Sequence, residues 1–578
     1  MKPVSIRRRP PVPVAGWPDS VHPLLARVYA ARGLTPAGLA GQRMASLLPP
    51  AAIDGIDQAC ALLASAIAED LRICVVGDFD ADGATGTAVA VRGLTLLGAR
   101  RVGYRVPNRA REGYGLSVAL VESLAGADQP DLILTVDNGI ASLAGVAAAN
   151  ALGMRVIVSD HHLPGAQRPD AAAIVNPQLA ADTAPQLRNL AGVGVMFYLL
   201  LALRAHLRAS GTWSRPGVAE PDLAVLLDLV ALGTVADLVP LDANNRILVA
   251  AGLRRIRAGR ACAGVAALFR AARRDPARAV AADLGFALGP RINAAGRLED
   301  MGLGIECLLC DEPERADALA ARLSAINAER QGLQASMVEQ GEALVSRFLA
   351  RHGDAHLPLG IVLHEPDWHP GVVGLVAARL KERLHRPVVA CAPAGADGAE
   401  LRASARSIPG FHLRDAVAEV DAACPGLITR FGGHAMAAGM SLPAENLAQF
   451  AAEFDAVARR RIDPQALERS AWSDGELAPG DFSHAAAHAL RYAGPWGQGF
   501  AEPVFDNAFA VESWRVVGEK HLKLRLRAEG GEAVDAILFD GLDCTPPPPR
   551  VRALFQLDLN EWNGSERLQL LVRQIEAV

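Results

Sequence analysis

Aspartates follow several apolar segments of this sequence at the point where each segment ends. VVGDFDADG carries Asp78, Asp80 and Asp82, LILTVDNG carries Asp137, and VALGTVADLVP carries Asp237. A single aspartate at the end of a strand is most often the N-cap of the next helix. Many carboxylates in one crevice would repel one another and raise one another's pKa unless cations neutralised them. The joint pattern therefore favours a divalent metal site.

A further apolar segment, in VIVSDHH, ends on Asp160, His161 and His162. One interpretation of the two histidines is an ordinary pair in a solvated loop, as an alternative to a role in a metal site. Because side chains of consecutive residues leave the backbone in different directions, we expect the two imidazoles to point apart. We expect His161 to bind metal and His162 to face a phosphate, with Asp160 orienting one imidazole.

Oxygen ligands with one or two imidazoles suit Mn²⁺ or Mg²⁺ better than a metal that prefers thiolates. A carboxylate such as Asp82 could bridge two ions about 4 Å apart. Two ions so placed activate a water molecule and stabilise the leaving oxygen of an in-line displacement at phosphorus. The residues therefore predict hydrolysis of a phosphoester.

Short apolar runs alternate with alanine- and leucine-rich stretches of helical length in the first half of the chain. Examples are LRICVVGDFD followed by TAVAVRGLTLLGA, and DLILTVDNG followed by SLAGVAAANALG. This order predicts an α/β fold with a parallel sheet and helices on both faces. Ligands bind beyond the carboxyl ends of the strands in such a sheet. We expect all four acidic segments to be strands that deliver their side chains to this edge.

The rest of the chain changes character twice. From about Asp311 to Leu349 the pattern predicts one long helix, or two in tandem, as a connector. LGIVLH and PVVACA, around GVVGLVAARLKERLH, predict a second α/β unit, and short alternating runs after Trp472 predict a small β-barrel or sandwich. The expected parts are an N-terminal extension (1–50), a first α/β domain (51–305), a connecting helix (306–352), a second α/β domain (353–462) and a C-terminal barrel (463–578).

The composition is that of a globular protein with several domains. The chain has 578 residues, and its apolar runs near Leu132 and Val156 are shorter than the roughly 20 residues of a membrane span. The basic N-terminus has prolines where a secretory signal needs an apolar core, so we expect a cytoplasmic protein without a membrane segment. Cys307 and Cys310 have CxxC spacing but no second pair, which predicts reduced, buried thiols. The net charge of −5 gives no general signal for nucleic acid.

The motifs GDFDADGATGT, TVDNG, SDHH and GTVADLVPL resemble the successive motifs of the DHH phosphoesterase superfamily. DWHPGVVGLVAARL, ASARSIPGFHL and RFGGHAMAAGM resemble its associated second, DHHA1-type domain. The order is similar to that of RecJ-type single-stranded-DNA exonucleases across nearly the whole chain. Gly86 stands where that family commonly has serine. The resemblance implies a 5′-to-3′ exonuclease that uses Mn²⁺ or Mg²⁺ to release mononucleotides from single-stranded DNA in recombination and DNA repair.

The resemblance also implies roles for individual residues. His162 would contact the scissile phosphate, and Asp160 and Arg291 join it as catalytic candidates. Arg291, Asn293 and Arg297 would contact the DNA backbone, with a solvated capping loop as the alternative. The implied metal ligands are Asp80, Asp82, Asp137, His161 and Asp237, with Asp78 as a further candidate.

An enzyme that starts at a DNA end needs a pocket for that end. In ASARS, Ser404 and Arg406 alternate along an apparent strand and so share one face. Together with FGGH they could cradle a phosphate through backbone N–H groups and a bidentate guanidinium. By resemblance this is a 5′-phosphate pocket, whereas the alternative is a structural turn with an exposed arginine. The residues expected to contact the 5′ end of the DNA are Arg109, His369, Ser404, Arg406, Gly433 and His434.

In HLKLRLR the leucines occupy one face of a strand and the basic residues, including Lys523 and Arg525, the other. A basic face on a small barrel is typical of an OB-fold that follows a phosphate backbone, and a solvated face is the alternative.

Two other functions stay open at this point. One is a DHH hydrolase of short oligonucleotides or cyclic dinucleotides, which is expected to lack the barrel. The other is an inactive replication scaffold, which would not need the metal ligands. For the exonuclease we expect a monomer that acts on single-stranded DNA with a 5′ end, with a helicase and a single-strand-binding protein as candidate partners.

Overall fold

The computed structural model describes residues 5–107, 112–179, 185–214, 219–352, 357–394, 398–562 and 565–578. The chain divides into two compact units, which we describe separately. One combines Arg8–Ile326 with Ser473–Val578, and the other combines Met1–Arg7 with Asn327–Trp472. Both units are therefore built from segments that lie far apart in the sequence. The domain limits expected from the sequence stay predictions.

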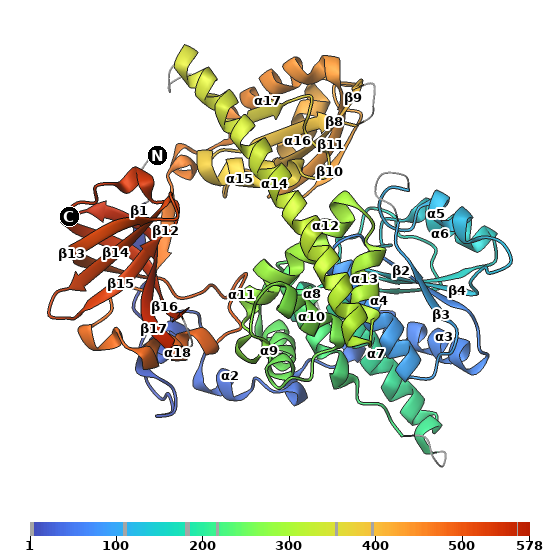
Figure 1. Ribbon diagram of the computed structural model, residues 1–578. Helices are drawn as coiled ribbons and strands as arrows, with labels where there is room; N and C mark the ends of the chain where they lie inside the picture. Colours follow the sequence, from blue (N-terminus) through green and yellow to red (C-terminus); the bar gives the residue numbers. More distant parts are fainter. Residues whose placement is uncertain are drawn as a thin grey trace. The chain divides into compact units, whose positions relative to one another are not determined.

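A five-stranded parallel sheet forms the centre of the first half of the chain (Figure 1). The strand order is β3 (Val102–Arg105), β2 (Ile73–Gly77), β4 (Leu132–Val136), β5 (Arg155–Ser159) and β6 (Ala173–Val175). The strands β2 and β4 are buried along their whole length, as in parallel sheets with helices on both faces. The α/β fold predicted from the sequence is confirmed, and the carboxyl ends of β2, β4 and β5 share one edge.

Alternate residues of the strands face two different sets of helices. Val75 and Leu134 belong to the core formed with α3 (Ile56–Ala68), α4 (Ala81–Leu96) and α7 (Gly192–Ala209). Val76 and Ile133 pack instead with α5 (Val118–Leu124) and α6 (Leu143–Ala151). The sheet is thus covered on both faces, which leaves its carboxyl edge as the place where polar loops gather.

Helix α7 is apolar and long enough to span a membrane by length and composition alone, with a mean hydropathy of 1.3. However, most of it is buried inside the protein, where it packs against α3 and α4. An apolar helix that is mostly buried is a core helix in a globular domain. Its N-terminus lies next to Asp82, at the carboxyl edge of the sheet.

The region after α7 is helical, and this corrects one expectation. VALGTVA lies in α8 (Leu227–Ala236), not in a strand. Almost every residue of α8 is buried, so its sequence is apolar throughout, and such a run does not distinguish a buried helix from a buried strand. The other helices here are α9 (Ala243–Arg257), α10 (Ala263–Ala271), α11 (Ala281–Asp283), a π-helix (Leu284–Leu288), α12 (Gly289–Leu298) and α13 (Gly302–Leu309).

The connector is one continuous helix, α14 (Pro313–His352), of 40 residues. The alternative of two helices in tandem is thereby resolved. The unit boundary at Ile326 and Asn327 lies within this helix.

The second unit contains a mixed sheet with the order β10 (Arg430–Gly433), β11 (Ala437–Pro443), β9 (Glu400–Arg406), β8 (Val388–Pro393) and β7 (Ile361–His364). Strands β7 and β8 are parallel, and α15 (Val373–Leu384) connects them in the sequence, as predicted. Strand β9 is antiparallel to both of its neighbours. Helices α16 (Leu413–Ala423) and α17 (Leu447–Arg461) complete the core with the sheet.

The C-terminal strands close into a barrel, which settles the choice between barrel and sandwich (Figure 1). The chain enters it through β12 (Ser470–Ser473), which pairs with β1 (Ser5–Arg8), and α18 (His484–Tyr492). Helix α1 (Pro23–Ala30) packs nearby, where Tyr29 donates a hydrogen bond to the Ala493 carbonyl (2.6 Å). The barrel order is β13 (Phe505–Val517), β14 (His521–Ala528), β15 (Ala533–Leu538), β17 (Ser565–Ala577) and β16 (Arg550–Trp562).

Candidate metal centre

The loop between β2 and α4 carries Asp78, Asp80 and Asp82. Asp80 is the N-cap of α4, because its Oδ1 accepts the backbone N–H groups of Asp82 and Gly83, both at 3.0 Å. Capping occupies only one oxygen of this carboxylate. Asp78 and Asp82 are buried, with 4% and 1% of their surface exposed, so they are not ordinary surface carboxylates.

Asp82 lies against the N-terminus of α7. Its Oδ2 accepts the backbone N–H of Gly192 at 2.6 Å and its Oδ1 that of Val193 at 2.9 Å. The N-cap residue of α7, Ala191, has no side chain that could make these bonds. Asp82 therefore satisfies N–H groups that a helix leaves unpaired and lies at the positive end of the helix dipole.

Asp137 follows β4 in a left-handed backbone conformation, with φ at 63°. It packs directly on α7, because a Cβ atom at Gly192 would lie 2.5 Å from the Asp137 Cβ. Asp137 Oδ1 lies 3.0 Å from His161 Nε2, yet among the described residues no hydrogen bond reaches it. Asp78 Oδ1 is likewise buried without a donor in the part of the chain that the structure describes. Buried carboxylate oxygens without donors are costly, and a shared cation would compensate both of them.

Asp160 organises the segment after β5. Its Oδ1 accepts the backbone N–H groups of His161 (2.7 Å) and His162 (3.1 Å) and lies 2.7 Å from His162 Nδ1. Its Oδ2 accepts the N–H of Ile140 (2.9 Å). The imidazole that Asp160 orients is therefore that of His162.

The two imidazoles do not point apart, so this expectation from the sequence was wrong. Their ring centroids are 4.6 Å apart, and His161 Nε2 and His162 Nδ1 lie 3.0 and 3.9 Å from the same Asp137 Oδ1. Strand β5 ends at Ser159, and beyond it the backbone turns around the Asp160 carboxylate. The alternation of side chains along a strand no longer applies there.

Asp237 reaches the same place from the end of α8, where it is the C-cap residue. Its Oδ2 lies 3.7 Å from His161 Nε2, and Asp82 Oδ2 lies 4.0 Å from that nitrogen. The potential ligand atoms form three overlapping groups, each within 4.8 Å: Asp78, Asp80 and Asp137; Asp82, His161 and Asp237; and Asp137, His161 and His162. All six residues expected to bind metal are thus brought together.

The electrostatics of this cluster favour a cation. Burial, together with the neighbouring aspartates, raises the pKa of Asp82 to about 7 and the pKa values of Asp78, Asp137 and Asp237 well above the usual range. Burial lowers the pKa of His161 to about 4, so this imidazole is neutral and can act as a ligand. The donor set of carboxylates and a neutral imidazole suits Mn²⁺ or Mg²⁺.

His162 has a different electrostatic environment from His161. Burial by itself lowers the pKa of His162, but the hydrogen bond to Asp160 and the charge of that carboxylate raise it above its ordinary value. The same pairing holds the pKa of Asp160 below its usual value despite burial. The pair can thus keep a positive charge at His162, next to the potential ligands.

Helix α12 supports the acidic loop. Asn293 Oδ1 accepts the N–H of Ala81 at 2.8 Å, which holds the first turn of α4. Arg291 donates through Nε to Ser324 Oγ (2.9 Å) and through Nη1 to the Ala287 carbonyl (2.6 Å). Arg297 is half-buried on the same helix. A contact of these three residues with substrate stays a prediction.

In the second unit, Ser404 and Arg406 of β9 lie beside the first turn of α15. A Cβ atom at Gly374 would lie 3.2 Å from Arg406 Nη2 and 3.4 Å from Ser404 Oγ. Gly439 of β11 is the register partner of Ser404, and Gly432 of β10 is the partner of Gly439. Since both of these residues are glycines, the surface next to Ser404 carries no side chain at these two positions of the described strands.

The other residues expected to bind the 5′ end of the DNA have different surroundings in the structure. Gly433 has a φ of 143°, and the N–H of His434 donates to the Ala437 carbonyl (2.8 Å), so both shape the turn between β10 and β11. His369 Nδ1 accepts the N–H of Gly371 (3.1 Å). Arg109 lies outside the described residues.

On the barrel, the leucines of β14 are buried and its basic residues face outward, as predicted. Acidic neighbours, however, neutralise much of this face. Asp535 of β15 lies 3.3 Å from Lys523 Nζ and 3.1 Å from Arg525 Nη1, and Glu512 of β13 lies 3.7 Å from Arg525 Nε. Strand alternation predicted the face, but it does not show which residues lie opposite on neighbouring strands.

Two residues near the centre were not singled out from the sequence. Gly192 allows α7 to approach Asp137, and only the fold places the two together. The ring of Tyr114 lies edge-on to His162, with centroids 6.2 Å apart, and its hydroxyl is 3.4 Å from the Asp137 carbonyl oxygen. A signal existed in the sequence, because Tyr114 stands between two glycines, Gly113 and Gly115. In the structure both glycines have a positive φ.

Comparison with known domains defines the class of protein first. Residues 72–234 match the N-terminal domain of the DHH family, residues 356–460 the DHHA1 domain, and residues 473–574 the RecJ OB domain. The chain is 49% identical to a single-stranded-DNA-specific exonuclease RecJ from Dickeya dadantii, over 100% of both chains.

Solved structures agree with this assignment. RecJ from Thermus thermophilus in complex with Mn²⁺ aligns with a TM-score of 0.79 and 33% identity, over 99% of this chain and 79% of that chain. Its complex with Mg²⁺ aligns with a TM-score of 0.74 and 31% identity, over 99% and 78%. The chain belongs to the RecJ family of single-stranded-DNA-specific exonucleases.

Proposed function

We propose that this chain is a metal-dependent exonuclease that degrades single-stranded DNA from its 5′ end to mononucleotides, in recombination and DNA repair. The observation that carries the proposal is the buried group of carboxylates with His161 at the carboxyl edge of the sheet, which among the described residues lacks hydrogen-bond donors for Asp78 Oδ1 and Asp137 Oδ1. The names of the relatives support the substrate.

The cofactor that we propose is Mn²⁺ or Mg²⁺, as two ions. When bound, such ions supply Lewis-acid activation of water and stabilise the charge that develops at phosphorus. The proposed ligands are Asp78, Asp80, Asp82, Asp137, His161 and Asp237. Because Asp82 and Asp137 are both fixed against the first turn of α7, this helix sets the spacing of the ligands.

His162 is the proposed contact to the scissile phosphate. Asp160 holds its Nδ1 and favours the protonated form, so Nε2–H can donate to a phosphate oxygen. The ring of Tyr114 limits the positions that this imidazole can adopt. We place Arg291 among the catalytic candidates as well, although its guanidinium is engaged by Ser324 and Ala287.

The proposed site for the 5′ phosphate is the surface of the second unit around Ser404 and Arg406. A guanidinium, a hydroxyl and the N-terminus of α15 meet there beside an open glycine surface, and each of these groups favours an anion. His369, Gly433, His434 and Arg109 are proposed to join it. Asn293, Arg297, Lys523 and Arg525 are the proposed contacts to the DNA backbone.

The alternatives have less support. A DHH hydrolase of short oligonucleotides or cyclic dinucleotides is expected to lack a barrel, whereas this chain has a closed one. An inactive scaffold would not need six potential ligands in one buried cluster. We also propose a cytoplasmic monomer that works with a helicase and a single-strand-binding protein.

The test is a time course with Mn²⁺ on 5′-phosphorylated single strands that carry a label at the 5′ nucleotide. We expect early release of the labelled mononucleotide, no cleavage of duplex, and no activity in EDTA. Shortening from the 3′ end, or hydrolysis confined to dinucleotides, would contradict the proposal.

Substitution of Gly192 by alanine should lower the rate of hydrolysis about 100-fold, because a displacement of roughly 1 Å in an active site has effects of this size. The new Cβ would lie 2.5 Å from the Asp137 Cβ, so α7 or Asp137 has to move. Gly332→Ala on α14 is the matched control, since its Cβ meets nothing within 4 Å among the described residues. Wild-type rates and Mn²⁺ affinity for Gly192→Ala would show that α7 does not position Asp137.

Substitution of Asp535 by asparagine should strengthen binding of single-stranded DNA about two- to fivefold, since exposed ion pairs of this kind have small energies. The change releases Lys523 and Arg525 from a carboxylate that now lies within 3.3 Å of both. Anisotropy titrations in EDTA at several salt concentrations measure the effect, with Glu220→Gln near α7 as the control. Unchanged affinity would mean that this barrel face does not contact DNA.

A further inference from the structure

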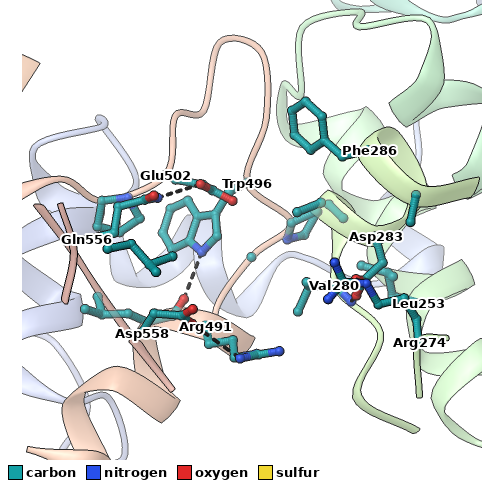
Figure 2. A pocket seen from close by; sticks show the side chains of 18 of the residues that line it. Leu253, Arg274, Val280, Asp283, Phe286, Arg491, Trp496, Glu502, Gln556 and Asp558 are labelled. Atoms are coloured by element: carbon teal, nitrogen blue, oxygen red, sulfur yellow. Dashed lines mark hydrogen bonds and ion pairs between the residues drawn. The ribbon is translucent and has the colours of Figure 1, made fainter. Parts of the chain in front are cut away.

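A cavity of about 400 Å³ lies between the helical part of the first α/β domain and the barrel, within one compact unit. Figure 2 shows Val280, Asp283 and Arg274 on one wall and Gln556, Asp558 and Trp496 on the opposite wall. Cavities of this size hold small organic ligands. None of the motifs that indicated the metal centre contributes to it.

An aromatic side chain at the rim is unusually exposed. Phe286 belongs to the π-helix Leu284–Leu288 and has 82% of its surface accessible to solvent. Single-turn π-helices occur often at functional sites, and an exposed phenylalanine at a cavity can serve as a stacking surface for a planar ring. Leu253, Val280 and Leu571 add apolar contacts to the lining of the cavity.

Three arginines, Arg257, Arg274 and Arg491, line the cavity together with three carboxylates, so its charges balance in number, but the ion pairs do not include every arginine. Asp558 pairs with Arg491 (3.3 Å), Asp283 with Arg274 (3.7 Å), and Glu502 with Arg573 (3.9 Å). Arg257, in contrast, donates Nε to the Ala279 carbonyl (2.7 Å) and lies over the ring of Tyr492, and no carboxylate of the described residues pairs with it. This arginine can therefore bind an anion without giving up an ion pair.

The cavity wall is built directly on the end of α8. A Cβ atom at Gly285 would lie 3.2 Å from Val235 Cγ1, and one at Gly289 would lie 3.2 Å from Ala236 Cβ. The next residue, Asp237, belongs to the potential metal ligands, and Leu238 after it is 67% exposed. The segment that carries Asp237 thus packs against the turn that carries Phe286.

We propose that this cavity binds one nucleotide, with the base stacked on Phe286 and its polar edge toward Gln556 and Asp558, and the phosphate at Arg257. A nucleotide consists of a planar base with hydrogen-bonding groups on its edge, a sugar and a phosphate, and the cavity offers complements to the ring, to its edge and to the phosphate. Two sources share this chemistry: a nucleotide of the bound strand beyond the cleaved end, or a released mononucleotide. The proposal rests on the exonuclease function for the identity of both.

Binding in EDTA tests the proposal on the full chain, because no turnover occurs there. The probes are dAMP and dTMP, followed by calorimetry, and a length series of 5′-phosphorylated oligo(dT), followed by anisotropy. Phe286→Ala removes a side chain that is almost fully exposed, so the fold should be retained. Arg257→Gln is the second variant. Leu152→Ala, an exposed apolar residue after α6, is the control.

We expect Phe286→Ala to weaken one class of probe about tenfold, as loss of a base-stacking contact does. If the site holds the strand, the defect appears only for oligonucleotides long enough to reach it, and KM rises with kcat unchanged. If the site holds a mononucleotide, binding of dAMP and dTMP weakens, and product inhibition weakens equally. For either ligand, Arg257→Gln should reduce the salt dependence of binding.

Wild-type affinity of Phe286→Ala and Arg257→Gln for all of these probes would overturn the proposal. This failure is distinct from failure of the proposed function. A chain that does not degrade single strands with Mn²⁺ but binds dAMP through Phe286 would refute the exonuclease and retain the nucleotide site.

Discussion

Replacement of Asp137 by asparagine should lower kcat on single-stranded DNA on the order of 10³-fold, as removal of a charge-stabilising group from an active site does. The side chain keeps its shape, and asparagine tolerates the positive φ of this position. What changes is the charge of a carboxylate that belongs to two of the three potential ligand groups. Binding of DNA in EDTA should stay at the wild-type level.

The metal-free variant should also be at least as stable as the wild type. Burial and four neighbouring aspartates raise the pKa of Asp137, which means that its ionised form is unfavourable in the empty site. Asp131→Asn, at the other end of β4, is the matched control: its side chain accepts the N–H of Arg72, on the protein surface. Wild-type kcat for Asp137→Asn would remove this residue from the chemistry.

Mn²⁺ should stabilise the fold more strongly as pH rises. Asp82 has its pKa raised to about 7, so the folded state binds its proton more tightly than the unfolded chain, where aspartate titrates near about 4. The metal-free fold therefore loses stability as pH increases through this window, and cations that bind the ionised carboxylates restore it.

At a concentration of about 100 times Kd, a ligand stabilises the folded state by about 2.7 kcal/mol, which corresponds to a rise in Tm of about 3 °C for a unit of this size. We expect this rise at about pH 8 and a much smaller one at about pH 5.5, where Asp82, with its pKa raised to about 7, is largely protonated. Thermal melts with and without Mn²⁺ at both pH values measure it. An equal shift at both would show that the ions bind elsewhere.

Local sequence was enough for most of the metal centre. The acidic residues after β2, β4 and β5 follow apolar runs, and a parallel sheet brings the ends of such runs to one edge. Asp237 was placed in the cluster, but on the wrong element, because a fully buried helix is as continuously apolar as a buried strand.

Contacts between distant segments could not be predicted in the same way. The orientation of His162 depends on how the backbone turns around Asp160, and the close approach of Gly192 to Asp137 depends on the docking of α7. The hydrogen bonds of Arg291 and Asn293, and the acidic partners of Lys523 and Arg525, come from neighbouring elements that no local pattern identifies.

We propose that carboxylates from separate elements and the His161 imidazole hold divalent ions at one hydrolytic centre. Anomalous diffraction from a crystal soaked in Mn²⁺ tests this arrangement most directly. We expect strong peaks bounded by Asp82, Asp137, His161 and Asp237, which weaken in Asp137→Asn. Peaks only at other positions, or a cluster that stays empty at saturating Mn²⁺, would contradict it.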